Sequence, residues 1–225
     1  IGIYQCIRRG LLALHELDFE SQDDDVIKRL DASVADAYAD MFGWYARAMG
    51  LPVGKLVCAS NRNRVLADFF ETGRYDRNRE FHRTMSPSMD ILISSNLERF
   101  LFEVTGHDAD RVETWYASLA SEGRFTVDGP TLTAMREVIV PGWVDDDRVL
   151  ATIGSTYRAH GYVLDTHTAV AVALHDGLAS QGRYVVVDAT ASPYKFSSDV
   201  LRGLGGEGTV DEFASVARLH ELTGL

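Results

Sequence analysis

Two short apolar runs constrain the fold of this chain most. Residues 56–59 and 184–187 are both apolar, and each run ends at a polar turn. Short apolar runs with such flanks are typical of strands buried on both faces. Because helical spacing precedes the second run and follows the first, the order of helix, strand and turn predicts an α/β fold. If both strands belong to one parallel sheet, their polar turns meet at its carboxyl edge, where such sheets bind ligands.

Helical spacing fills most of the remaining chain. Apolar residues recur there at three- and four-residue steps, and glycine or proline follows several of the segments. The spacing predicts helices over residues 3–17, 26–50, 65–72, 97–105, 108–121, 129–138 and 168–178, with another beginning at 144–147.

The charge of the chain excludes several partners. Its 33 acidic and 22 basic residues give a formal net charge of -11, so its mean field repels phosphate backbones and anionic lipids. We therefore expect no nucleic acid and no membrane as partner, since no apolar run approaches the ~20 residues of a membrane helix. Two cysteines, Cys6 and Cys58, form neither a disulfide framework nor a metal-ligand cluster. We expect a soluble, cytoplasmic protein without a metal site, and we interpret Ile1 as the cut end of something longer.

The turn over residues 188–196 is the first candidate site. It places Thr190, Ser192, Pro193 and Lys195 directly after the second predicted strand. Hydroxyls and a lysine in that position can bind a ligand. They can equally satisfy backbone groups within a turn that proline stabilises, and both interpretations remain open.

A second candidate is the loop over residues 85–99. Small hydroxyls and an amide there, from Ser86, Ser88 and Asn96, can bind an anion. The sequence by itself favours an ordinary loop in which Ser94 or Asn96 caps the helix that begins near Leu97.

Two further groups of residues receive structural interpretations. The arginines between residues 74 and 83 alternate with acidic residues, which is typical of a solvated surface with internal ion pairs. His167 lies at the predicted start of an apolar helix, where Asp165 or Thr166 as cap is the simpler explanation. Neither His160 nor His167, the two histidines closest in sequence, has the i, i+4 spacing with a carboxylate that indicates a zinc helix.

Four segments of the chain resemble the threonine synthases in order and spacing. They are residues 45–61, 84–99, 161–173 and 190–196, and the resemblance covers about four-fifths of the chain. It implies a helix-rich, three-layer α/β portion of a tryptophan-synthase-β-like enzyme (pyridoxal-phosphate fold type II), incomplete in this chain. It further implies a carbon-oxygen lyase that uses pyridoxal 5'-phosphate to convert O-phospho-L-homoserine and water to L-threonine and phosphate.

The resemblance also implies roles for single residues. Thr190 aligns with the family's hydroxyl that faces the pyridine nitrogen of the cofactor. The substrate-pocket candidates are residues in the matching segments: Ser86, Ser88, Asn96 and His167.

The family's cofactor lysine has no counterpart here. That lysine lies in an N-terminal part, within a Ser-Phe-Lys-Asp-like sequence, and neither Lys55 nor Lys195 matches it. Lys28 is the third lysine of the chain and is no better candidate. We therefore assign no catalytic residue within this chain.

Residues 1–39 depart from the family pattern. Where the family has a glycine-rich phosphate loop, residues 34–40 contain Asp36 and Asp40 and no glycine, and the apolar strand before that loop is expected to be missing. We divide the chain into a divergent helical N-terminal segment, residues 1–39, and a threonine-synthase-like C-terminal domain, residues 40–225.

Two functions follow from these patterns. In the first, the chain is a fragment of a threonine synthase, inactive alone, whose partner is the missing N-terminal part that carries the lysine. In the alternative, it is a non-catalytic or divergent threonine-synthase-like protein, either an interaction module or a phospho-lyase relative.

Overall fold

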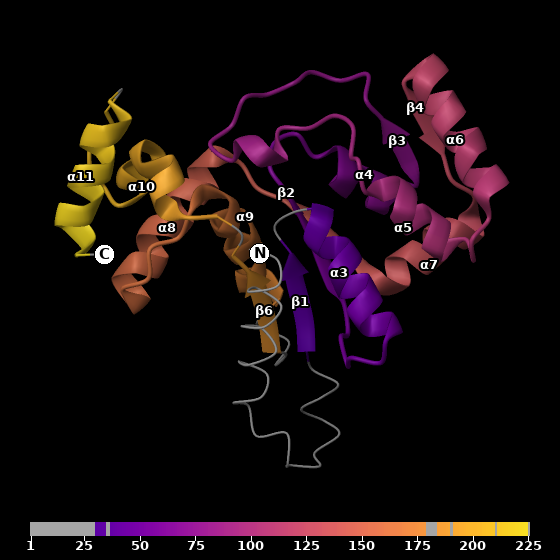
Figure 1. Ribbon diagram of the computed structural model, residues 1–225, viewed down its shortest axis with the longest axis horizontal. Helices are drawn as coiled ribbons and strands as arrows, with labels where there is room; N and C mark the ends of the chain where they lie inside the picture. The colour runs from indigo at the N-terminus through magenta and orange to yellow at the C-terminus, as the bar shows by residue number, and fades with distance from the viewer. Residues whose placement is uncertain (1–29, 35–36, 179–183, 190, 210, 225) are drawn as a thin grey trace, which may run out of the picture.

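The computed structural model describes residues 30–34, 37–178, 184–189, 191–209 and 211–224 (Figure 1). The predicted helix over residues 3–17 lies outside the described residues. So does Thr190.

A parallel sheet of four strands forms the centre of the described chain. Its strand order is β5 (Ile139–Trp143), β2 (Leu56–Ser60), β1 (Leu30–Val34) and β6 (Tyr184–Asp188). Each neighbouring pair is parallel, so the carboxyl ends of all four strands share one edge. Both strands predicted from the apolar runs are confirmed, as is their membership of one parallel sheet.

The strand β1 corrects two expectations. The predicted helix over residues 26–50 is wrong for Leu30–Val34, and among the described residues of that range the helix is α3 (Ala37–Ala48). The strand that we expected to be missing before residues 35–40 is present. Val34 pairs with Cys58 on one side and with Asp188 on the other, so pairing with two neighbours overrides the local pattern. The division of the chain at residue 39 stays a prediction.

Helices cover both faces of the sheet, which gives three layers. Leu56 and Cys58 of β2 belong to one hydrophobic core, whereas Ala59 belongs to the other, because successive strand residues point to opposite faces. On the first face, Gly43 of α3 lies so near Leu56 that an added Cβ would be 2.5 Å from Cδ2. On the second face lies α9 (Thr166–Leu178).

The remaining elements form two groups, one at each end of the molecule (Figure 1). One group contains α4 (Val65–Thr72), β3 (Arg74–Asp76), α5 (Leu97–Val104), α6 (Ala109–Glu122), β4 (Arg124–Thr126) and α7 (Gly129–Val138). The other contains α8 (Asp146–His160), η3 (Pro193–Phe196), α10 (Ser197–Gly203) and α11 (Glu212–Thr223). The helices predicted over residues 65–72, 97–105, 108–121, 129–138 and 168–178 are confirmed, and Gly73 ends α4 with a φ of 76°.

The first core contains a cluster of aromatic rings. Phe69 is fully buried, and its ring centroid lies 5.6 Å from that of Tyr75 and 5.5 Å from that of Phe125. Tyr75 and Phe125 face each other across the two-stranded sheet of β3 and β4. These contacts fix the start of the loop that leaves β3.

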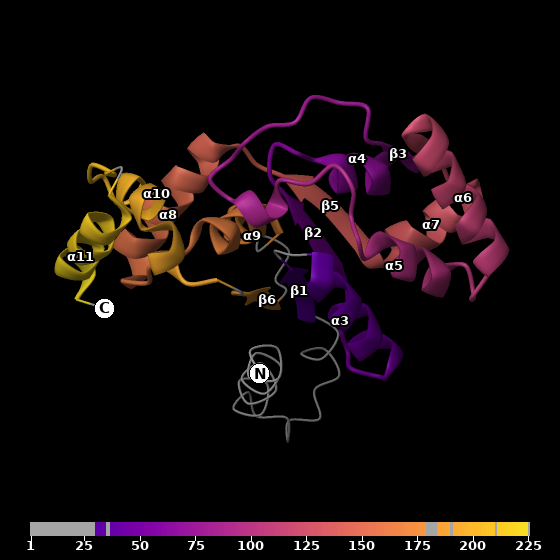
Figure 2. The same ribbon diagram turned by 45° about the horizontal axis from the view of Figure 1, so that its top comes forward.

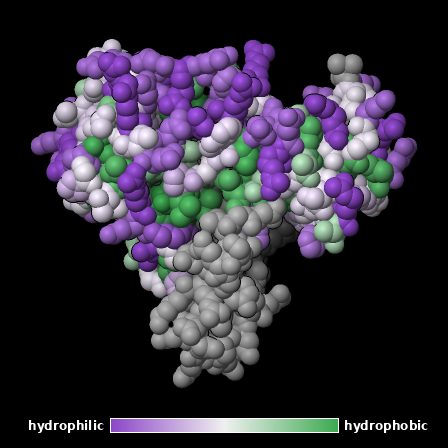
Figure 3. Space-filling model, turned by 180° about the vertical axis from the view of Figure 1, so that it is seen from behind, coloured by the Kyte–Doolittle hydropathy of each residue, from purple (hydrophilic) through white to green (hydrophobic). Residues whose placement is uncertain are grey.

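That loop positions the site. It runs from β3 to α5, contains η1 (Pro87–Met89), and arches over the end of the parallel sheet between the two groups of helices (Figure 2). On the face opposite to that of Figure 1, apolar side chains gather near the centre and polar ones surround them (Figure 3). In the described part of the chain, we find no helix with the length and apolarity needed to span a membrane.

Candidate functional site

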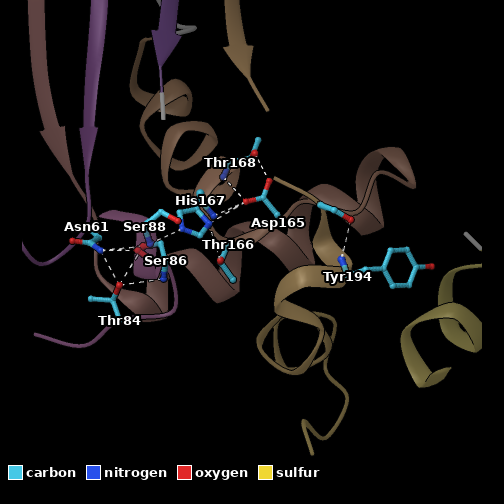
Figure 4. Close-up of polar contacts among 10 residues, drawn as sticks. Asn61, Thr84, Ser86, Ser88, Asp165, Thr166, His167, Thr168 and Tyr194 are labelled. Atoms are coloured by element: carbon cyan, nitrogen blue, oxygen red, sulfur yellow. Dashed lines mark hydrogen bonds and ion pairs between the residues drawn. The ribbon is translucent and has the colours of Figure 1, made fainter. Parts of the chain in front are cut away.

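Two asparagines follow β2 at the carboxyl edge of the sheet. Asn61 and Asn63 are 1% and 3% exposed, and such buried amides require hydrogen-bond partners. Asn61 Nδ2 lies 2.8 Å from Thr84 Oγ1 and 3.1 Å from Ser86 Oγ (Figure 4). Asn63 donates from Nδ2 to the carbonyl of His82 and accepts from its N–H. The loop is thereby fastened to the end of β2.

Asp90 is the common acceptor of this network. Its Oδ1 accepts hydrogen bonds from Asn61 Nδ2 at 2.8 Å and from Asn63 Nδ2 at 2.9 Å. Thr84 donates to the same carboxylate from its N–H, at 2.9 Å, and from its hydroxyl, at 2.8 Å. A single carboxylate therefore accepts hydrogen bonds both from the segment after β2 and from the loop itself.

His167 joins the loop to the other group of helices. It lies near the start of α9, is 4% exposed, and its Nε2 accepts a hydrogen bond of 3.1 Å from the Ser88 N–H (Figure 4). Its ring centroid is 4.6 Å from that of Phe196 in η3. Because Nε2 is an acceptor, the proton of the neutral ring is on Nδ1, which lies 3.4 Å from Asp165 Oδ1.

Asp165 holds the start of α9. Its Oδ1 accepts from the N–H groups of His167 and Thr168, at 2.8 and 3.1 Å, so the predicted cap is confirmed. Burial acts to raise the pKa of Asp165, but the hydrogen bonds from His167 and Thr168 outweigh it and hold this pKa below its usual value. Asp165 is therefore a carboxylate at neutral pH.

The structure brings together some of the substrate-pocket candidates predicted from the sequence, but not all of them. Ser86, Ser88 and His167 come together at this site. Asn96 does not join them in the described residues, since its Oδ1 accepts from Arg99 and its Nδ2 has no partner there. The Asn96 side chain forms no capping hydrogen bond to α5, so the predicted cap is wrong for this residue.

The turn after β6 has a structural role where it is described. Ser192 Oγ accepts a hydrogen bond of 3.3 Å from the Tyr194 N–H at the start of η3 (Figure 4). The arginine-rich segment likewise contains the expected ion pairs, of Arg74 with Asp76 and of Arg79 with Asp68.

Sequence reasoning placed the turn that contains Asn61 at the ligand-binding edge of the sheet, but it did not single out Asn63, Thr84 or Asp90 as site residues. Two asparagines directly after a buried strand are the signal that was available, because an amide in that position must find partners at the sheet edge. The acceptor that they share lies 29 residues beyond Asn61, and no local pattern indicates it.

The described lysines do not fit a covalent cofactor anchor. Lys55 Nζ donates to the carbonyls of Arg136 and Glu137, at the start of β2 and thus at the end opposite Asn61. Lys195 is exposed, and its Nζ lies 5.4 Å from the ring centroid of Phe196. A Schiff-base lysine must face the reacting group, so the described residues do not by themselves hold pyridoxal phosphate covalently. Nor do these residues contain a group of three or more potential metal ligands.

Tyr75 fastens the far end of the loop. Its hydroxyl donates to the Leu92 carbonyl at 3.0 Å and accepts from the Ser94 N–H at 2.9 Å. Burial raises the pKa of Tyr75 to about 12, against the hydrogen bond from Ser94 and the charges of Arg79 and Arg77, which lower it.

This raised pKa predicts a loss of stability in alkali. Above pH 10 the folded state retains the Tyr75 proton, whereas the unfolded state releases it. The contribution of this group to the free energy of unfolding is therefore complete below pH 10 and is lost as the pH approaches about 12. We expect the urea midpoint to fall over this range, and to fall less steeply in Tyr75→Phe. An equal slope in both proteins would contradict the prediction.

Comparisons with known proteins identify relatives of this chain. No family model matches the chain. Threonine synthase-like 1 of Macaca fascicularis is 40% identical over 161 residues, which are 71% of this chain and 22% of that protein. Threonine synthase of Pseudomonas aeruginosa is 37% identical over 171 residues, or 75% of this chain and 36% of that protein. The chain thus spans about a fifth to a third of the length of these curated relatives.

A solved structure extends the match to nearly the whole fold. The PLP-bound threonine synthase from Brucella melitensis has a TM-score of 0.78 and 35% identity, over 93% of this chain and 44% of that chain. The three-layer α/β portion of a fold type II enzyme, expected from the sequence, is thereby confirmed. The chain belongs to the threonine synthase family, of which it represents a partial, C-terminal-like region.

Proposed function

We propose that this chain is part of a threonine synthase that converts O-phospho-L-homoserine and water to L-threonine and phosphate. The observation that carries the proposal is the shared fold with the PLP-bound enzyme of Brucella melitensis at 35% identity. Pyridoxal phosphate is then the cofactor. We assign its lysine to a segment outside this chain, because Lys55 and Lys195 do not fit that role and the sequence around Lys28 does not match the family's lysine segment.

The polar loop contributes one wall of the substrate pocket. Ser88 is exposed on η1, whereas Ser86 is fully buried and hydrogen-bonded to Asn61. We assign contact with substrate to the Ser88 hydroxyl, and the holding of the loop to Ser86, Asn61 and His167. The resemblance leaves Thr190 as the hydroxyl that faces the pyridine nitrogen of the cofactor.

The test uses the protein at its natural length, purified with pyridoxal phosphate. We expect it to release phosphate and form threonine from O-phospho-L-homoserine in equal amounts, and the present chain alone to release none. Ser88→Ala should lower kcat/KM by about tenfold or more, through loss of a hydrogen bond to substrate. Ser118→Ala on α6 is the matched control, because none of the hydrogen bonds of Ser86, Ser88 and His167 within the described residues involves Ser118. An intact, cofactor-loaded protein that releases no phosphate would exclude this function.

A second function has one specific observation in its favour. The identity with threonine synthase-like 1 is 40%, above the 37% with threonine synthase of Pseudomonas aeruginosa. A divergent relative would either release phosphate with a keto acid in place of threonine, as a phospho-lyase, or turn nothing over and serve in binding alone. The products of the assay distinguish these outcomes directly.

A further inference from the structure

A cavity lies beside the loop. It is a cavity of about 510 Å³ at the carboxyl ends of β2 and β5, where the Val144 N–H donates to the Ser60 carbonyl. Its lining has two walls of opposite charge. Arg62 and Arg64 come from the segment after β2, and Asp145, Asp146 and Asp147 come from the start of α8. Trp143 and, from the loop, His82 complete the lining.

Of the two arginines in the basic wall, Arg64 is held by its neighbours, whereas Arg62 is not. The Arg64 Cζ lies 4.5 Å from the centroid of the Trp143 ring, and its Nε is 3.4 Å from Asp68 Oδ1 on the same helix. Arg62 is exposed and makes no ion pair or side-chain hydrogen bond with any residue that the structure describes. Its guanidinium is therefore available to a carboxylate.

The acidic wall is partly used by the fold. Asp145 accepts from the Arg148 N–H as the cap of α8, and Asp146 Oδ1 lies 3.4 Å from the Met85 N–H. Burial raises the pKa of Asp146, and the charges of Asp199 and Asp90 raise it further. Asp147 is exposed and makes no such contact within the described part of the chain. Asp147 therefore carries a negative charge that no described residue pairs.

The opposite walls do not neutralise each other either. Among the described residues, no ion pair joins Arg62 or Arg64 to Asp145, Asp146 or Asp147 across the cavity. A simple anion pairs only with the guanidinium groups and a simple cation only with the carboxylates, so each leaves the other wall without a partner. A ligand that carries both charges satisfies both walls. The volume is in the range of small-molecule sites and far above the ~30 Å³ of one water molecule.

We propose that this cavity binds a free α-amino acid as its zwitterion, with the carboxylate on Arg62 and Arg64 and the ammonium group on Asp146 and Asp147. The site goes beyond the proposed function, since it needs neither the cofactor nor a lysine. It adjoins the polar loop through the hydrogen bond from Met85 to Asp146, one residue before Ser86.

The test is a calorimetric and fluorescence titration of the natural-length protein, with Trp143 as a reporter beside the ligand. The probes are L-threonine, L-serine, propionate, propylamine and inorganic phosphate. We expect saturable binding of an L-amino acid but not of propionate, propylamine or phosphate at the same concentration. Arg62→Gln and Asp147→Asn should each weaken this binding about tenfold or more, because each removes one charge-assisted contact.

The controls separate this site from the candidate functional site. Arg218→Gln and Glu113→Gln remove the same charges from exposed positions on α11 and α6 and should leave the affinity unchanged. Ser88→Ala should also leave it unchanged, although it lowers phosphate release if the proposed function holds. The proposal is overturned if neither amino acid saturates the protein, if phosphate or propionate binds as tightly, if the Arg62 and Asp147 variants bind normally, or if Ser88→Ala abolishes binding.

Discussion

Replacing Asp90 by alanine is expected to lower the free energy of unfolding by about 3 kcal/mol, because hydrogen bonds to a charged acceptor are worth more than neutral ones. The carboxylate accepts from Asn61, Asn63 and Thr84. Both asparagines are almost completely buried, so their amide groups lose a partner that water cannot readily replace. Urea unfolding followed by circular dichroism measures the change.

Two further variants make this prediction specific. Asp90→Asn retains one acceptor oxygen and should fall between the wild type and Asp90→Ala. Glu113→Ala, at an exposed position of α6, should change the free energy of unfolding by less than about 0.5 kcal/mol. If Asp90→Ala were as stable as Glu113→Ala, the network would not hold the loop.

Replacing Phe69 by alanine is expected to cost about 4 kcal/mol of unfolding free energy, within the range observed for buried phenylalanines. The side chain is fully buried and contacts the rings of Phe70, Tyr75 and Phe125. The cavity that remains cannot collapse easily, because α4 and β3 both pack around it. Denaturant titration gives the free energy.

A matched control is available at the other end of the molecule. Phe213 on α11 is 88% exposed, so Phe213→Ala removes the same ring without opening a cavity. We expect a change within about 0.5 kcal/mol. A similar cost for both substitutions would mean that Phe69 does not support the first core.

The helices were predictable where one segment carried all of the signal. The helix α4 is an example, since its apolar spacing and the glycine at its end lie within residues 65–73. The strand β5 was not predicted because Pro141 and Gly142 interrupt its apolar run, and an edge position tolerates both. The strand β1 depends on pairing with β2 and β6, and no local pattern records such partners.

The site residues, like the helices, were predictable where a single segment of the sequence carried the signal. Ser88 and His167 came from segments that resemble the family, and the structure joins them by a hydrogen bond across 79 residues. Asp90 was overlooked because its importance lies in four donors that converge from two segments. Convergence of that kind is a property of the folded chain.

The hydrogen bonds of the loop between β3 and α5 restrict how the length of this loop can vary. Surface connections usually tolerate insertions, but this one is fastened at His82, Thr84, Ser86, Ser88 and Ser94. An added residue between Thr84 and Ser94 would displace at least one of these groups from its partner after β2, on α9 or at Tyr75. Length variation is therefore confined to the exposed positions Glu80 and Phe81, between the hydrogen bonds of Arg77 and Asn78 to the end of α6 and those of His82 to Asn63. A long connection on the surface of this protein behaves, for insertions and deletions, like a segment of its interior.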